Sequence, residues 1–133
     1  MKTNNKWAMA ALIAASAVGL SDAQAPPAGI KRSDLMREDL SAPGREVIQV
    51  LVEFAPGVAF PRHSHPGEEL VYVVEGSLVY EVDGRPPVTL AAGDVLFIPA
   101  GAVHAVRNVG DGKGAELATY VVEKGKQLIT LAQ

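Results

Sequence analysis

The stretch Gly57–Gly76, G-V-A-F-P-R-H-S-H-P-G-E-E-L-V-Y-V-V-E-G, places two histidines and a glutamate close together. His63 and His65 are two residues apart, so on a strand both imidazoles leave the same face and can reach one point. The proline-glycine pair at 66–67 interrupts the strand and turns the chain, which brings Glu69 back toward the histidines. The stretch therefore predicts three ligands for one metal ion, where two neighbouring strands meet.

A second segment, Gly93–Asn108 (G-D-V-L-F-I-P-A-G-A-V-H-A-V-R-N), offers His104 as a fourth ligand after a turn at 99–101. The chain has three histidines, and all of them lie in these two segments. Neutral imidazoles and one carboxylate suit Fe(II), Mn(II), Ni(II), Cu(II) or Zn(II). Four protein ligands on a six-coordinate ion would leave two positions for substrate, water or dioxygen, which is typical of a reactive site.

The two segments resemble the two motifs of the cupin family, and all ten fixed motif positions match. The first motif, G-x5-H-x-H-x3-E-x6-G, is matched by Gly57, His63, His65, Glu69 and Gly76. The second, G-x5-P-x-G-x2-H-x3-N, is matched by Gly93, Pro99, Gly101, His104 and Asn108. The resemblance covers about residues 45 to 122. It implies an all-β fold, a single jelly-roll β-barrel (double-stranded β-helix), with the metal held inside its mouth by His63, His65, Glu69 and His104.

The rest of the sequence also favours strands. After residue 23 no segment has a sustained 3.6-residue period, and β-rich runs recur at the spacing of a sandwich or barrel. An edge strand followed by a turn fits within 30–41. The other expected strands are 45–54, 69–75, 78–82, 88–90, 95–98, 115–122 and 128–131, with a further strand that begins at His104.

Strand alternation predicts which side chains surround the metal. If Glu69 points into the barrel, Val71 and Val73 also point inward, while Leu70, Tyr72 and Val74 point outward. By the same rule Val106 and Asn108 share the face of His104, whereas Arg62 and Arg107 face away from the ligands. Tyr72, Tyr80, Phe97 and Tyr120 are candidates for the pocket lining or for ordinary packing. Glu68 competes with Glu69 as the ligand, and the motif spacing favours Glu69.

Composition narrows the classes of partner. The 133 residues fit one domain, and 48% hydrophobic residues are enough for a sizeable core. The net charge is −3, and no basic cluster is longer than Lys31-Arg32, which argues against nucleic acid and favours a small-molecule substrate or ligand. The absence of cysteine excludes disulfides, thiolate zinc sites and cysteine nucleophiles. The oligomeric state stays open, with a homodimer among the alternatives.

The N-terminus reads as a secretory signal peptide: Lys2 and Lys6 precede the apolar run 7–20, and small residues follow. Cleavage after Ala23 is preferred to cleavage after Ala25, because Pro26 would follow the second scissile bond. The run is too short for a comfortable membrane span, so we expect a periplasmic or secreted protein without a permanent anchor. The expected organisation is a signal peptide at 1–23, a leader at 24–44 and the cupin barrel at 45–133.

The expected function is that of a metal-dependent enzyme acting on a small organic molecule. The family resemblance spans several reaction classes. We expect dioxygenase-like chemistry, and isomerase or lyase chemistry are the alternatives. A periplasmic binding or sensing module without turnover is a second hypothesis, and a structural or storage protein is a third. No histidine remains for acid-base catalysis, so a base would be metal-bound hydroxide, a tyrosine, or a carboxylate such as Glu68 or Glu53. The sequence identifies no catalytic residue beyond the metal ligands.

Overall fold

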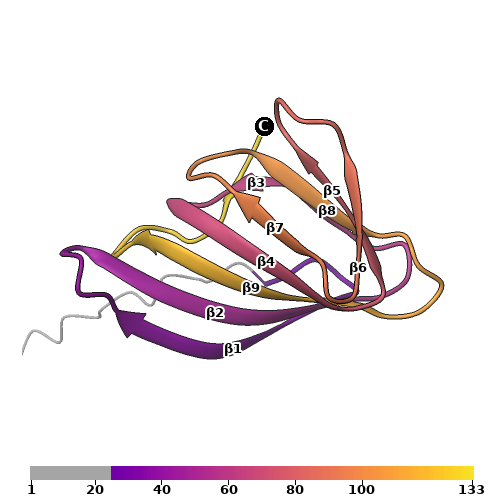
Figure 1. The fold of residues 1–133 in the computed structure, drawn as a ribbon, viewed down its shortest axis with the longest axis horizontal. Helices are drawn as coiled ribbons and strands as arrows, with labels where there is room; N and C mark the ends of the chain where they lie inside the picture. Colours follow the sequence, from indigo (N-terminus) through magenta and orange to yellow (C-terminus); the bar gives the residue numbers. More distant parts are fainter. Residues whose placement is uncertain (1–24) are drawn as a thin grey trace, which may run out of the picture.

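The computed structural model describes residues 25–133, which form strands and turns and contain no helix. This confirms the predicted all-β fold, whereas the signal peptide predicted for 1–23 lies outside the described residues. Figure 1 shows the strands along the chain. They are β1 (Ile30–Asp39), β2 (Arg45–Phe54), β3 (Ala59–Ser64), β4 (Gly67–Glu75), β5 (Ser77–Val82), β6 (Val88–Ala91), β7 (Val95–Ile98), β8 (His104–Asn108), β9 (Gly114–Glu123) and β10 (Thr130–Leu131).

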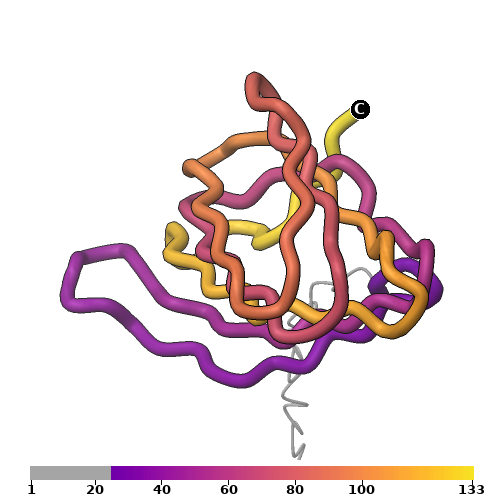
Figure 2. Tube along the Cα trace, turned by 45° about the vertical axis from the view of Figure 1, so that its right-hand side comes forward, coloured from indigo at the N-terminus to yellow at the C-terminus, as the bar shows by residue number. Residues whose placement is uncertain are grey.

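The strands form two antiparallel sheets that face each other as a jelly-roll barrel. One sheet has the order β1-β2-β9-β4-β7, and the other has the order β10-β3-β8-β5-β6. In Figures 1 and 2 the sheets enclose the interior, and the far end of the β1–β2 hairpin projects beyond the barrel. Within residues 25–133 there is no helix with the length and apolar character that a membrane crossing needs.

The interior is filled by alternate residues of the strands, as the sequence predicts. On β4, Glu69, Val71 and Val73 are at most 3% exposed, while Leu70 and Tyr72 are each 46% exposed. The predicted inward residues of β8 are also buried with His104. The core therefore lies between the two sheets, and the ligand positions share its face.

The edge strand expected within 30–41 is confirmed, and it is longer than a short edge strand. β1 pairs with β2 from Ile30 to Asp39, with a register shift between Asp34 and Met36. The segment that the sequence analysis assigned to a leader thus contains a full strand of one sheet. Its length is hard to predict because an exposed edge strand carries few inward-facing apolar residues.

The strand that carries Glu69 begins earlier than predicted, at Gly67 rather than at Glu69. A Cβ atom at Gly67 would lie 2.0 Å from the carbonyl oxygen of Val121, so only glycine lets β4 approach β9 this closely. The close approach fixes where the chain re-enters the sheet after His65. It therefore helps to place Glu69 opposite the histidines.

Gly67→Ala is expected to lower the free energy of unfolding by about 1–3 kcal/mol or more, because the added methyl group overlaps a backbone oxygen that cannot move alone. Gly112→Ala is the matched control, since a Cβ at that position meets no heavy atom within 4 Å. Urea unfolding of both variants measures the difference. Equal stabilities would contradict the proposed role of Gly67.

Candidate metal centre

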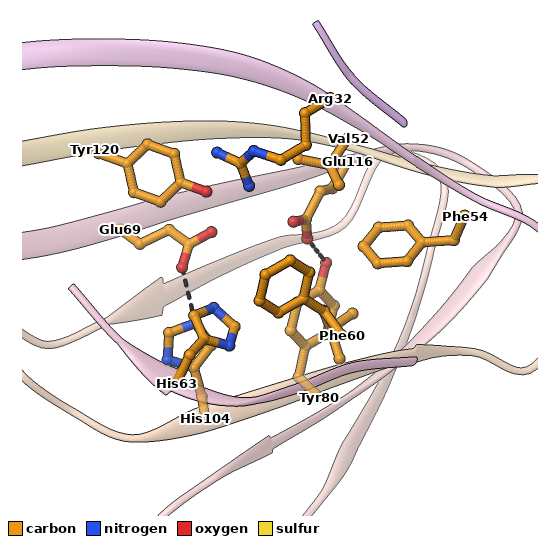
Figure 3. Close-up of a pocket in the computed structure, with 11 residues that line it drawn as sticks. Arg32, Val52, Phe54, Phe60, His63, Glu69, Tyr80, His104, Glu116 and Tyr120 are labelled. Atoms are coloured by element: carbon orange, nitrogen blue, oxygen red, sulfur yellow. Dashed lines mark hydrogen bonds and ion pairs between the residues drawn. The ribbon is translucent and has the colours of Figure 1, made fainter. Parts of the chain in front are cut away.

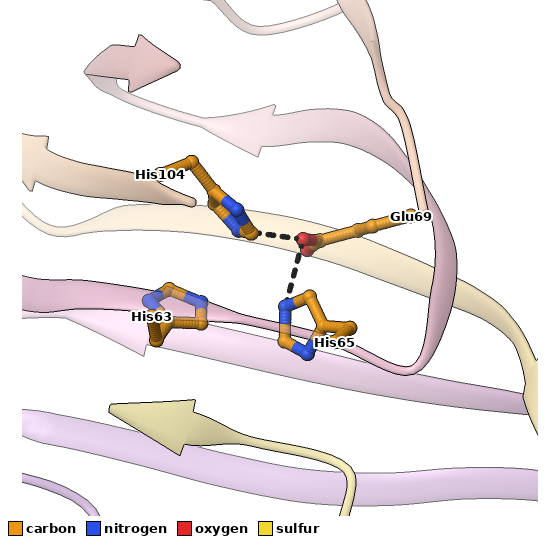
Figure 4. Close-up of side chains that lie close together, drawn as sticks. All are labelled: His63, His65, Glu69 and His104. Atoms are coloured by element: carbon orange, nitrogen blue, oxygen red, sulfur yellow. Dashed lines mark ion pairs between the residues drawn. The ribbon is translucent and has the colours of Figure 1, made fainter. Parts of the chain in front are cut away.

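The four predicted ligands come together inside the barrel. His63 lies on β3, His65 in the turn that follows, Glu69 on β4 and His104 on β8. Each offers one ligand atom, and these atoms all lie within 4.8 Å of one another. Figure 4 shows the side chains converging from the different segments. All four residues are buried, so the cluster could hold a metal ion.

Backbone contacts between the two motif segments position the histidines. His63 and His104 are register partners on β3 and β8, and a β-bulge precedes His63. Gly101, with a φ of 72°, donates its backbone N–H to the carbonyl oxygen of His65 at 3.2 Å. A residue with a Cβ rarely adopts this left-handed conformation, so the glycine of the second motif helps to lock the turn of the first.

The backbone also sets the tautomer of each imidazole. The Nδ1 atoms of His63, His65 and His104 lie 2.7 Å, 2.7 Å and 3.0 Å from the carbonyl oxygens of residues 61, 128 and 102. A carbonyl accepts a hydrogen bond, so each Nδ1 carries the proton and donates it. Each Nε2 atom then keeps its lone pair, as a metal ligand requires.

The inner atoms of the cluster therefore form a group of hydrogen-bond acceptors. The nearer Glu69 carboxylate oxygen, Oε2, is 3.1 Å from Nε2 of His65 and 3.0 Å from Nε2 of His104. Both His65 Nε2 and Glu69 Oε2 are buried without a hydrogen-bond partner among the described residues. Acceptors held this close in a buried site repel one another unless a cation or a proton lies between them. The donor set fits a divalent metal ion.

The electrostatics differ between the imidazoles: burial lowers the pKa of His104, but the hydrogen bond and the charge of Glu69 outweigh burial and raise it. Burial, together with the nearby His104, lowers the pKa of His63 to about 3, so its imidazole is neutral. Burial alone would raise the pKa of Glu69, but the adjacent imidazoles of His104 and His65 outweigh it and lower that pKa. The Glu69 side chain is thus an ionised carboxylate, which is the form that binds a metal ion.

A small pocket opens beside the ligands, with a cavity volume of about 10 Å³. Figure 3 shows its lining side chains. His63, Glu69 and His104 form one end. The remaining lining residues are Arg32, Val52, Phe54, Phe60, Tyr80, Val106, Glu116 and Tyr120. This space holds about one water-sized group, so the pocket as it stands suits an ion and a small ligand atom.

The aromatic candidates from the sequence divide into two groups. Tyr80 and Tyr120 line the pocket and are at most 2% exposed. Tyr72 and Phe97, by contrast, are 46% and 53% exposed on the outer face of the sheet. Only the first two are placed to contact a ligand at the centre.

Sequence reasoning missed Glu116 as a pocket residue. Its carboxylate is buried and accepts a short hydrogen bond from the Tyr80 hydroxyl, drawn as a dashed line in Figure 3. Burial and the nearby charge of Glu69 raise the pKa of Glu116 to about 8. Alternation on β9 was the available signal, because Glu116 shares the inward parity of Ala118 and Tyr120.

The carboxylates that the sequence offered as general bases lie elsewhere. Glu53 binds Lys113 at 2.9 Å on the surface, and neither Glu53 nor Glu68 lines the pocket. Arg62 forms a two-pronged ion pair with Asp83 at 2.7 Å and 2.8 Å, away from the ligands as expected. Glu69, and not Glu68, lies in the cluster that could hold a metal ion.

The chain belongs to the cupin family: the model of the cupin domain matches residues 50–127, more than half of its length. Among curated proteins it is 37% identical over 57 residues to the dimethylsulfoniopropionate lyase DddQ of Ruegeria pomeroyi, covering 43% of this chain and 28% of the lyase. It is 34% identical over 72 residues to an oxalate-binding protein of Thermotoga maritima, covering 53% and 59%.

Solved structures give the same fold. An oxalate oxidase in complex with the substrate analogue glycolate superposes with a TM-score of 0.65 at 25% identity, over 80% of this chain and 56% of the oxidase. The chain spans less than two thirds of each of these three relatives. The likeness therefore establishes the family and the barrel, and the activities of the relatives remain theirs.

Proposed function

We propose that this protein binds one divalent transition metal through His63, His65, Glu69 and His104, and uses it as an enzyme on a small organic molecule. The observation that carries the proposal is the buried group of acceptor atoms. Three of these atoms belong to imidazoles whose tautomers are set by backbone carbonyls. When bound, such an ion supplies Lewis acidity and, if it is redox-active, electron transfer. Fe, Mn, Ni, Cu and Zn all accept this donor set.

An enzyme is favoured over a storage protein by the residues beside the cluster. The Tyr80–Glu116 pair places a hydrogen-bonded hydroxyl and carboxyl group on the wall of the same pocket. A carboxyl group whose pKa is raised to about 8 can both hold and release a proton near neutral pH. Glu116 thus takes the acid-base role for which the sequence had offered Glu68 or Glu53.

A binding module without turnover is the second candidate. The names of the relatives include a lyase, an oxidase and an oxalate-binding protein, so both catalysis and binding occur among proteins similar to this chain. The small size of the pocket also favours binding of a compact ligand.

Metal substitution tests the proposal and its dioxygenase form. We expect purified protein to contain about one transition-metal ion per chain by elemental analysis. Oxygen uptake with enolisable or phenolic substrates is expected with Fe(II) or Mn(II) and is expected to disappear with Zn(II), because Zn(II) has no redox chemistry. Equal turnover with Zn(II) would replace dioxygenase chemistry by Lewis-acid lyase or isomerase chemistry. Tight ligand binding without turnover in any metal form would favour the binding module.

A further inference from the structure

Arg32 occupies an inward-facing position on the edge strand β1. It is the register partner of Val52, which is in turn the partner of Glu116 on β9, so all three side chains point to the same side of the sheet. Figure 3 shows the Arg32 guanidinium reaching into the pocket beside the hydroxyl of Tyr120. A long cationic side chain thus lies where strand alternation normally places an apolar one.

The guanidinium of Arg32 has no carboxylate partner at ion-pair distance in the part of the chain that the structure describes. Other arginines do: Arg62 pairs with Asp83 at 2.7 Å, and Arg37 lies 3.5 Å from Glu46. Arg32 is also half-buried, so it has lost part of its hydration. A partly desolvated cation without an acidic partner favours an anion that arrives from outside the chain.

The charge balance of the pocket points the same way. The pocket lining holds two carboxyl groups, Glu69 and Glu116, which contribute at most two negative charges. Arg32 contributes one positive charge, and a divalent ion at the ligands would contribute two. The loaded pocket therefore has an excess of positive charge, which attracts an anionic ligand.

We propose that Arg32 is the residue that selects the ligand, by binding the carboxylate of a small organic anion that lies between the guanidinium and the metal centre. The planar fork of a guanidinium matches the two oxygens of a carboxylate. Because the free space is about the size of one water molecule, side chains of its wall must move to admit the anion, which limits it to a few heavy atoms. This inference deepens the proposed function and rests on it, because it assumes a metal at the four ligands.

Calorimetric titration of Zn(II)-loaded protein with glycolate and with glycolamide tests the inference. The two probes have nearly the same size, but only glycolate carries a charge. We expect wild-type protein to bind glycolate and to bind glycolamide at least about tenfold more weakly, because a hydrogen-bonded charge is lost. R32Q is expected to lose about tenfold or more in glycolate affinity, and R32K is expected to lose less, because lysine keeps the charge without the fork.

Arg85→Gln is the matched control, since Arg85 is exposed and lies outside the pocket. Its glycolate affinity should equal that of the wild type. Metal content is measured on every sample. Two results, each obtained with full zinc content, would overturn the role of Arg32 and leave the metal site intact. One is equal glycolate affinity in wild type and R32Q, and the other is no glycolate binding at all. Failure of the wild-type chain to retain metal would overturn the proposed function and this inference together.

Discussion

Glu69→Gln is expected to reduce metal affinity by more than about 100-fold while it stabilises the metal-free protein. Removal of outer partners of metal ligands already costs about 10–100-fold, and this change removes the one carboxylate of the set. In the metal-free protein the same change replaces an unpartnered acceptor oxygen by an amide N–H group. That group can donate to Nε2 of His65 or of His104, which lie 3.1 Å and 3.0 Å from Oε2 of Glu69.

Two measurements check the two directions. Competition with a chelator gives the metal affinity, and urea unfolding after chelation gives the stability of the metal-free protein. Glu68→Gln is the matched control, because it makes the same chemical change one position away and outside the cluster. Similar metal affinities in the two variants would refute the ligand assignment. A metal-free Glu69→Gln protein that is less stable than wild type would refute the argument from facing acceptors.

The cluster of candidate ligands was predictable from the sequence because the signals that place it are local, and the barrel was predictable because both segments resemble the cupin motifs. His63 and His65 share a face through a spacing of two residues, and the turn at 66–67 lies within the same stretch. The positive φ of Gly101 likewise belongs to a turn that the nearby proline predicts. Such features depend on residues that are close in sequence, so they can be predicted without the order of strands in the sheets.

Arg32 and Glu116 were missed because their position in the pocket depends on pairing between strands that are distant in sequence. Arg32 meets the pocket only because β1 pairs with β2 in a register that sets it beside Val52, and Glu116 reaches the same place through the register of β2 with β9. Sequence alternation assigns each residue to a face, but it does not say which distant strand lies alongside. The polar wall of the pocket therefore became visible only with the sheet order.

Glu116, the acidic residue of this wall, should make the free energy of unfolding depend on pH. The pKa of Glu116 is about 8 in the folded protein, raised by burial and by Glu69, against an ordinary value of 4.5. Between these values the folded state holds a proton that the unfolded state has released. The stability that this proton contributes is therefore complete below pH 4.5 and is lost as the pH rises toward about 8. The slope is about 1.4 kcal/mol per pH unit for one group.

Glu116→Gln removes this titration and keeps the shape of the side chain. We therefore expect the free energy of unfolding of the variant, minus that of chelated wild type, to rise by about 1.4 kcal/mol per pH unit across this range. The opposing effect of His63, whose buried imidazole resists protonation, occurs in both proteins and cancels in the difference. Tyr80→Phe is the control, because it removes the hydrogen-bond donor but retains the carboxyl group and its slope. Urea unfolding at several pH values gives the difference, and a value independent of pH would show that Glu116 ionises as freely inside the barrel as in water.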